Sequence, residues 1–562
     1  MSKTHFNDMH LPRPDVDEVT ASYAGVSKAF DEAGTTAERA AAIRDWDRVR
    51  GRLWTYLSLT GLRFNQDTRD AERKAEREYA DSIRPKLQNL DTEIMRKLLD
   101  SPHRAEMEAE IGAQAFALWD CEIGTFSKEI EDDLVEESRL EAEYVELLAS
   151  AEIEFRGETY NLPGLGKFAE DSDRETRHAA STTSWNWTGS QGDKLDRIYD
   201  DLVKLRHKMA RKLGYDNFIG MGYKRMGRID YDQNDVENFR AQVRDTLVPL
   251  CGKIREKQRE MLGVDKLMAW DEPIHDPRGN PKPKGDHDWM LERATEMFDN
   301  IGGGLDTFWR EMNERGLLDL KTREGKAGGG FCTSFPEYKT PFIYANFNGT
   351  QGDVLVFTHE MGHAFQNHCS QELSPVDYLW PTSESCEIHS MSLEFLTWPE
   401  MDRFFGKEDG DRFRRQHLLG ALLFLPYGVA VDHFQHLVYA KPEATPAERH
   451  EMWLEMVRTY MPWRDWGDLA YPAMGGRWQR QGHIYSGPFY YIDYTLAQVC
   501  ALQYWIRAEK DFAEALESFV ALCKRGGEAP FQQLTKGAGL RSPFEDGALD
   551  EVVAKAAETL AL

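Results

Sequence analysis

The chain has 562 residues, of which 41% are hydrophobic and 29% are charged, so its length predicts more than one hydrophobic core. The 69 Lys and Arg residues against 96 Asp and Glu give a formal charge of −27, which argues against nucleic acid as the main partner and against docking on a membrane of anionic lipid. The seven cysteines form no CxxC pair, and the N-terminal segment contains no apolar run that resembles a secretory signal. We therefore expect a globular, cytoplasmic protein with reduced thiols.

Most of the chain has the residue pattern of helices. Thr35 and Glu38 form a capping-box signature ahead of a long helical stretch. Residues 341–348 (PFIYANFN) instead alternate apolar and polar side chains, and this alternation predicts a β-strand. The longest apolar run, residues 418–431, contains Pro426 and is too short to span a bilayer, so it predicts a buried core helix.

A helical segment after the predicted strand, VFTHEMGHAFQNH, carries three polar groups in an apolar context. His359 and His363 are four residues apart, so their side chains lie on the same face of the helix. Two imidazoles at this spacing can bind one zinc ion, and Glu360 beside them can take the proton of a water molecule. A pair of structural histidines is the alternative interpretation.

A zinc site of this kind needs a third protein ligand. The extended motif HExxHxxGxxH is excluded because Gln366 and Cys369 occupy its Gly and last His positions. The next candidate segment, residues 381–395, offers four residues: Glu384, Glu387, His389 and Glu394. Glu387 and Glu394 are seven apart and share a helical face, so one can bind metal while the other holds a ligand histidine. Periodicity alone does not choose among the four.

The run from Phe331 to His368 resembles the oligoendopeptidase F and thimet oligopeptidase family of zinc metallopeptidases, closest to the shorter bacterial, Pz-peptidase-like oligoendopeptidases. RQGHIYSGPFYYIDYTLAQ, LCKRGGEAPF and SPFEDG match further family motifs, so the resemblance covers roughly the last 360 residues. It implies one Zn²⁺ per chain, held by His359, His363 and Glu387, with Glu360 as the catalytic base.

The second matching motif contains a dense group of hydrogen-bond donors: His483, Tyr485, Tyr490, Tyr491 and Tyr494. Such donors can stabilise a developing oxyanion. The resemblance implies that a His and tyrosines of this segment face the zinc, and His483 carries over directly. We expect Tyr490 and Tyr494 to donate to the oxyanion, with Tyr491 as the next candidate. The choice among the four tyrosines stays open, and packing in the core is the alternative for each ring.

For the fold, the resemblance implies a mostly α, two-lobed helical shell around a deep substrate channel, with a small β-sheet beside the HExxH helix. We expect a helical N-terminal lobe over residues 1–195 and a catalytic lobe over residues 196–562, with the C-terminal helices able to pack back on the first lobe. The strand at residues 341–348 is expected to bind substrate backbone by strand addition.

For the function, the resemblance implies a zinc-dependent oligoendopeptidase that hydrolyses internal bonds of short unstructured peptides. A helical zinc carboxypeptidase is one rival, and a non-catalytic peptide-binding protein with a structural zinc is another. Glu360 weighs against the second rival, because a structural site needs no base and is usually closed by four protein ligands. Cleavage preference, physiological substrate and oligomeric state stay open.

Overall fold

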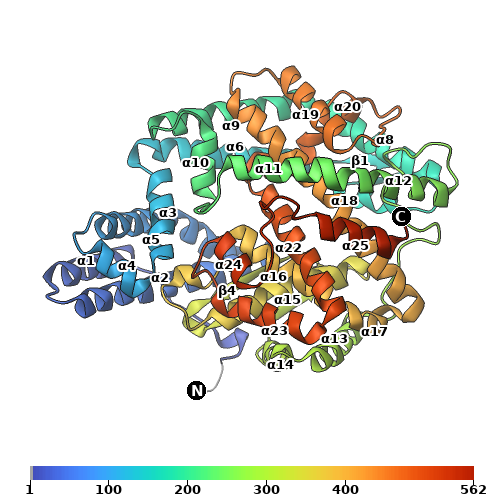
Figure 1. Cartoon of the computed structure of the whole chain (residues 1–562). Helices are drawn as coiled ribbons and strands as arrows, with labels where there is room; N and C mark the ends of the chain where they lie inside the picture. Colours follow the sequence, from blue (N-terminus) through green and yellow to red (C-terminus); the bar gives the residue numbers. More distant parts are fainter. Residues whose placement is uncertain (1–3) are drawn as a thin grey trace. The chain divides into compact units, whose positions relative to one another are not determined.

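The computed structural model describes residues 4–562 and is mostly helical, with two small β-sheets (Figure 1). The expected fold class, mostly α with a small sheet beside the HExxH helix, is confirmed. The chain groups into two compact units: unit 1 comprises residues 1–123, 282–411 and 500–541, and unit 2 comprises residues 124–281, 412–499 and 542–562. The division into lobes at residue 195 stays a prediction.

Unit 1 contains the second sheet and the helices around it. Its elements are α1 (Val16–Glu32), α2 (Thr36–Gln66), α3 (Ala71–Leu99), α4 (Arg104–Ile111), α13 (His287–Ile301), α14 (Leu305–Glu314), β3 (Leu318–Lys321), β4 (Phe331–Phe335), β5 (Thr340–Phe347), α15 (Gln351–Ser370), α16 (Ser383–Leu396), α17 (Asp402–Phe405), α23 (Phe512–Arg525) and α24 (Phe531–Gly537).

Unit 2 is helical apart from one short hairpin. Its elements are α6 (Glu131–Ala149), β1 (Ile153–Phe155), β2 (Glu158–Tyr160), α7 (Leu162–Gly166), α8 (Arg174–Ser190), α9 (Gly192–Lys212), α10 (Phe218–Arg225), α11 (Gln233–Gln242), α12 (Val248–Leu262), α19 (Pro446–Tyr460), α20 (Ala470–Ala473), α21 (Gly482–Ser486) and α25 (Asp550–Leu560). Three further helices begin in one unit and end in the other: α5 (Ala113–Thr125), α18 (Lys407–Ala440) and α22 (Tyr491–Lys510).

Local sequence signals explain where the first long helix begins. The predicted capping box is present, because Thr35 Oγ1 accepts the Glu38 N–H at 3.2 Å and Glu38 Oε2 accepts the Thr35 N–H at 3.0 Å. Further along α2, the fully buried Trp46 packs edge-on against Trp119, with ring centroids 5.3 Å apart. Such a pair contributes beyond the area it buries and ties α5 to α2.

The predicted strand is present as β5, but its place in the sheet corrects one expectation. The strand order is β3-β5-β4, so β5 is the central strand. It pairs with β3 in parallel and with β4 antiparallel, from Phe331 opposite Tyr344 to Phe335 opposite Thr340. Because both edges of β5 are occupied, the expectation that β5 binds substrate backbone by strand addition is wrong. β4 is an edge strand of this sheet.

Helix α15 is set against the sheet by the turn that precedes it. Gly349 adopts a φ of +86°, a conformation that glycine tolerates without strain. The Asp353 carboxylate then accepts the backbone N–H groups of Asn348 at 3.0 Å and Gly349 at 2.6 Å. These contacts join the end of β5 to the first turn of α15, which packs on β5, α16 and α23.

The apolar run at residues 418–431 lies within α18. Among the residues described, this is the one helix whose length and composition match a membrane span, and 72% of its apolar window is buried inside the protein. Such burial is typical of a core helix, as the sequence predicts.

Candidate metallopeptidase active site

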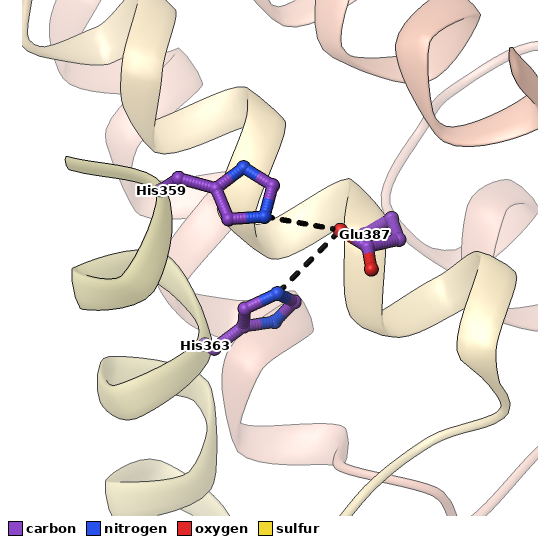
Figure 2. A group of neighbouring side chains, drawn as sticks. All are labelled: His359, His363 and Glu387. Carbon is purple, nitrogen blue, oxygen red and sulfur yellow. Dashed lines mark ion pairs between the residues drawn. The ribbon is translucent and has the colours of Figure 1, made fainter. Parts of the chain in front are cut away.

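Two neighbouring helices bring three candidate metal ligands together (Figure 2). His359 and His363 project from α15, and Glu387 projects from α16 between them, with its Oε2 3.3 Å from His359 Nε2 and 3.5 Å from His363 Nε2. A tetrahedral zinc with bonds of roughly 2.0–2.1 Å holds its ligand atoms about 3.3 Å apart. The donor set and its spacing therefore fit zinc, and three protein ligands leave a fourth position open.

Glu394, one of the alternatives for the third ligand, occupies a different place. Its Oε1 lies 2.7 Å from Nδ1 of His359, on the side of the ring opposite the Nε2 atom that faces Glu387. A carboxylate in this position fixes the tautomer and the orientation of a ligand histidine. Glu384 and His389, on the same helix, are not part of the three-residue group.

The Glu387 carboxylate and the His359 imidazole of this group shift each other's pKa values. Burial alone would lower the pKa of the His359 imidazole, but hydrogen bonds to Glu387 and Glu394 outweigh it and raise that pKa well above its ordinary value. Burial alone would raise the pKa of the Glu387 carboxyl, but His363 and His359 outweigh it and hold that pKa well below its ordinary range. Glu387 is therefore ionised, as a metal ligand must be.

Glu360 is next to His359 in α15 but is not one of the three candidate metal ligands. Its side chain is buried, and its Oε2 has no hydrogen-bond partner among residues 4–562. Burial raises the pKa of this carboxyl, which increases its affinity for a proton. A buried carboxylate oxygen without a protein partner needs an explanation, and a reacting water molecule or peptide would provide the partner.

A glycine allows the two ligand-bearing helices to approach closely. A Cβ atom at Gly362 would lie 2.4 Å from the carbonyl oxygen of His389 and 2.6 Å from Cα of Ser390. These are backbone atoms of α16, so they do not move aside as a flexible side chain can. The absence of a side chain at Gly362 therefore sets the separation of α15 from α16 and keeps Glu387 within reach of both histidines.

We expect Gly362→Ala to weaken metal binding although alanine is the better helix former. The added methyl group would push α16 away, and overpacking of this kind typically costs about 1–3 kcal/mol. Gly352→Ala on the same helix is the matched control, because its Cβ would meet only Thr350 Oγ1 at 3.4 Å. Competitive zinc titration and thermal unfolding of both variants measure the effect. Wild-type zinc affinity in Gly362→Ala would contradict this account of the helix spacing.

A cavity of about 560 Å³ lies in unit 1 beside the edge strand β4. Its lining includes Phe331, Cys332 and Thr333 of β4, together with residues of α2 and α3. The strand begins close to the Glu360 carboxylate, since a Cβ atom at Gly330 would lie 3.7 Å from Glu360 Oε1. The volume of the cavity is within the usual range for a ligand site.

The His–Tyr segment lies in unit 2, where most of its predicted donors cluster. The ring of His483 lies 5.6 Å from Tyr490, 5.1 Å from Tyr491 and 5.9 Å from Tyr494, and all four side chains are partly exposed. Tyr485 differs: it is fully buried, stacks on Tyr144 at 3.8 Å and donates to a backbone carbonyl. Tyr485 therefore belongs to the core.

A buried clamp that the sequence did not indicate holds this segment in place. Phe489 has a φ of +67°, a conformation that costs a non-glycine residue free energy. Its N–H donates to Gln435 Oε1 at 3.0 Å, and its carbonyl accepts from Arg228, which also pairs with Asp493 at 3.0 Å. The clamp fixes the turn between α21 and α22, and Tyr490 is the last residue before α22 begins. The positive φ is a tertiary effect with no local sequence signal.

The fold and the three-residue candidate metal group are those of a metallopeptidase of the HExxH class. The chain belongs to peptidase family M3: the model of the M3 N-terminal domain matches residues 6–126, and the model of family M3 matches residues 167–284 and 287–553. It is similar over 99% of both chains to a solved structure provisionally named oligoendopeptidase F, with 46% identity and a TM-score of 0.93. A Pz peptidase A solved with an inhibitor is 44% identical, with the same coverage and TM-score.

Curated relatives match over shorter segments. The oligoendopeptidase F homolog of Lactococcus lactis subsp. lactis (strain IL1403) is 26% identical over 132 residues, which is 23% of this chain and 21% of the relative. The chromosomal oligoendopeptidase F of Lactococcus lactis subsp. cremoris is 21% identical over 223 residues, 38% of this chain and 34% of the relative. The matched part thus spans between a fifth and about a third of the length of these relatives.

Proposed function

We propose that this chain is a zinc-dependent oligoendopeptidase that hydrolyses internal bonds of short, unstructured peptides. The observation that carries the proposal is the His359–His363–Glu387 group with the unpartnered Glu360 carboxylate beside it. A purely structural zinc site would not need Glu360, which argues against a non-catalytic binding protein. A cytoplasmic location, and the absence of nucleic-acid and membrane partners, stay predictions from the sequence.

In this proposal His359, His363 and Glu387 hold the zinc, and Glu394 orients His359. When bound, the metal supplies Lewis-acid polarisation of the scissile carbonyl and lowers the pKa of water. Glu360 takes the proton of the attacking water and passes it to the leaving amine. The burial that raises the pKa of Glu360 supports this double role, since the group has to hold a proton between the two steps.

We further propose that His483, with Tyr490 or Tyr494, donates hydrogen bonds to the developing oxyanion. The clustering and partial exposure of these rings support this role, and Tyr491 stays in reserve. Backbone recognition by strand addition is assigned to β4 instead of β5. The unpaired edge of β4 and the cavity beside it support this assignment, because an extended peptide there can gain main-chain hydrogen bonds with little dependence on sequence.

Digestion of a mixed peptide library, analysed by mass spectrometry, tests the proposal. We expect internal cleavage of peptides of roughly 5–20 residues, loss of cleavage in a metal chelator, recovery with zinc, and no attack on a folded protein. Metal analysis should find about one zinc per chain. Comparing the cleavage of intact casein with that of denatured casein tests whether cleavage requires an unfolded substrate. Stepwise release of single C-terminal residues would favour the carboxypeptidase alternative, and full activity in metal-free protein would exclude zinc chemistry.

A further inference from the structure

One arginine of unit 2 has no polar partner. Arg477 forms no ion pair and donates no hydrogen bond within residues 4–562, and its Nη1 atom is buried. The guanidinium group lies over the faces of Tyr427 and Trp185, with centroid distances of 5.1 and 5.9 Å. Contacts with ring faces stabilise the cation but leave the in-plane N–H groups without acceptors.

This situation differs from that of the buried arginines of the same protein. Each buried arginine among the described residues pairs with a carboxylate: Arg50, Arg177, Arg206, Arg228, Arg240, Arg255, Arg315 and Arg449. A chain with 96 acidic residues has many carboxylates available for such pairs. A partly buried arginine without one is therefore a candidate binding group for an external anion.

A second arginine adds to the positive charge. Arg480 lies 3.8 Å above the ring of Trp185 and donates to Ser184 Oγ at 2.7 Å and to Thr188 Oγ1 at 2.8 Å, which are all neutral partners. Burial, together with the nearby Arg477, lowers the pKa of Arg480 to about 9, so this group is still charged at neutral pH. Neither Arg477 nor Arg480 pairs with a carboxylate among residues 4–562, so no acidic side chain there neutralises the pair.

The pair is linked to the proposed catalytic segment. Tyr427, whose ring lies under Arg477, donates its hydroxyl to Gln481 Oε1 at 2.7 Å. Gln481 in turn contacts Nδ1 of His483 through its Nε2 at 2.9 Å. The unpartnered guanidinium and His483 are therefore parts of one contact chain within unit 2.

We propose that Arg477, with Arg480 beside it, binds a carboxylate group of the peptide substrate. This inference rests on the proposed peptidase function, and it specifies which peptides are preferred. A guanidinium group matches a carboxylate with two parallel N–H···O bonds, and partial burial strengthens such bonds. Peptides offer this group at the C-terminus and on Asp and Glu side chains. The pair also offsets, locally, the repulsion between an acidic peptide and a chain of charge −27.

Binding of labelled peptides, followed by fluorescence anisotropy, tests the proposal independently of turnover. The protein is the full chain with Glu360→Gln, so peptides stay intact. One peptide pair differs only in a free or amidated C-terminus, and a second pair differs only in one internal Asp or Asn. In at least one pair, we expect the peptide with the carboxylate to bind about 10-fold or more tightly than its neutral partner. This is the size of effect typical of a hydrogen bond to a charged group. The pair that discriminates identifies the source of the carboxylate.

Arg477→Gln should remove this preference, because it should weaken the binding of the acidic peptide and leave the binding of the neutral peptide unchanged. Arg477→Lys should retain part of the preference. Arg458→Gln is the matched control, because this exposed arginine of α19 pairs with Glu451 on the surface. Thermal unfolding establishes that the variants are folded. Equal weakening of acid and neutral peptides, an unchanged preference in Arg477→Gln, or no peptide binding in the parent would overturn the proposal. Absence of cleavage by the unmutated chain, with the preference intact, would instead refute the peptidase function alone.

Discussion

Glu360→Gln is expected to reduce kcat by at least about 100-fold while the protein keeps its metal. The substitution preserves the shape of the side chain but removes the group that can accept and return a proton. Because Glu360 is not part of the metal group, zinc content and thermal stability should stay close to those of the unmutated chain. The comparison of kcat with metal content therefore separates the chemistry from the binding of zinc.

The measurement is steady-state hydrolysis of a quenched fluorescent peptide together with metal analysis of the same sample. Glu372→Gln serves as the control, since this exposed glutamate of unit 1 pairs with Lys339 at the surface. KM should change little, because the proton transfer occurs in the transition state and not in the bound ground state. A Glu360→Gln protein with near-normal kcat would remove this residue from the mechanism. Loss of zinc in the variant would instead assign Glu360 to the metal site.

Glu387→Ala is expected to reduce zinc affinity by more than about 100-fold, above the 10–100-fold typical of losing a residue that only orients a ligand. Its Oε2 is the one carboxylate atom facing Nε2 of both His359 and His363. Removing it leaves two imidazoles and an open side toward α16. Glu394→Ala should fall within the smaller range, because it would free the His359 ring without removing a donor to the metal.

Glu384→Ala completes this series as the control, since Glu384 lies one helical turn before Glu387 and is outside the metal group. Zinc affinities of the three variants, measured by competition with a chromophoric chelator, should follow the order Glu387→Ala weakest, Glu394→Ala intermediate and Glu384→Ala near normal. If Glu384→Ala loses zinc while Glu387→Ala retains it, the assignment of the third ligand is wrong.

The proposals for the edge of β4 and for the arginine pair of unit 2 concern two substrate contacts of different kinds. The unpaired edge of β4 offers backbone groups, which any extended peptide can match. Arg477 and Arg480 offer charge, which favours one class of peptide over another. Broad acceptance of sequences with a preference for a carboxylate is therefore the specificity that these residues support.

Local patterns in the sequence identified the elements and the helix that carries the candidate metal ligands. Helical periodicity, the capping box at Thr35 and the alternation at residues 341–348 all depend on neighbours within a few positions, and the helix, the cap and the strand that they predict are present in the structure. The four-residue spacing of His359 and His363 depends only on helix geometry, so their common face was predictable. For the same reason the apolar run in α18 was recognisable as a core helix.

Only the tertiary structure decided the contacts between distant segments. Periodicity left four candidates on α16 for the third ligand, and the helix crossing at Gly362 places Glu387 between the histidines and Glu394 behind His359. The place of β5 at the centre of its sheet depends on the pairing of β3 and β4, which no pattern within residues 341–348 records.

Contacts between distant segments also decided the arrangement of side chains in unit 2 and the division of the chain into units. The burial of Tyr485, the positive φ of Phe489 and the unpartnered Arg477 each depend on residues far away in the sequence. Each compact unit is built from three separate segments, whereas sequence patterns can delimit only continuous ones. The sequence by itself therefore determined the helices, the family and the HExxH motif. The three-dimensional packing decided which side chains meet, because side-chain contacts depend on distances in space and not on spacing along the chain.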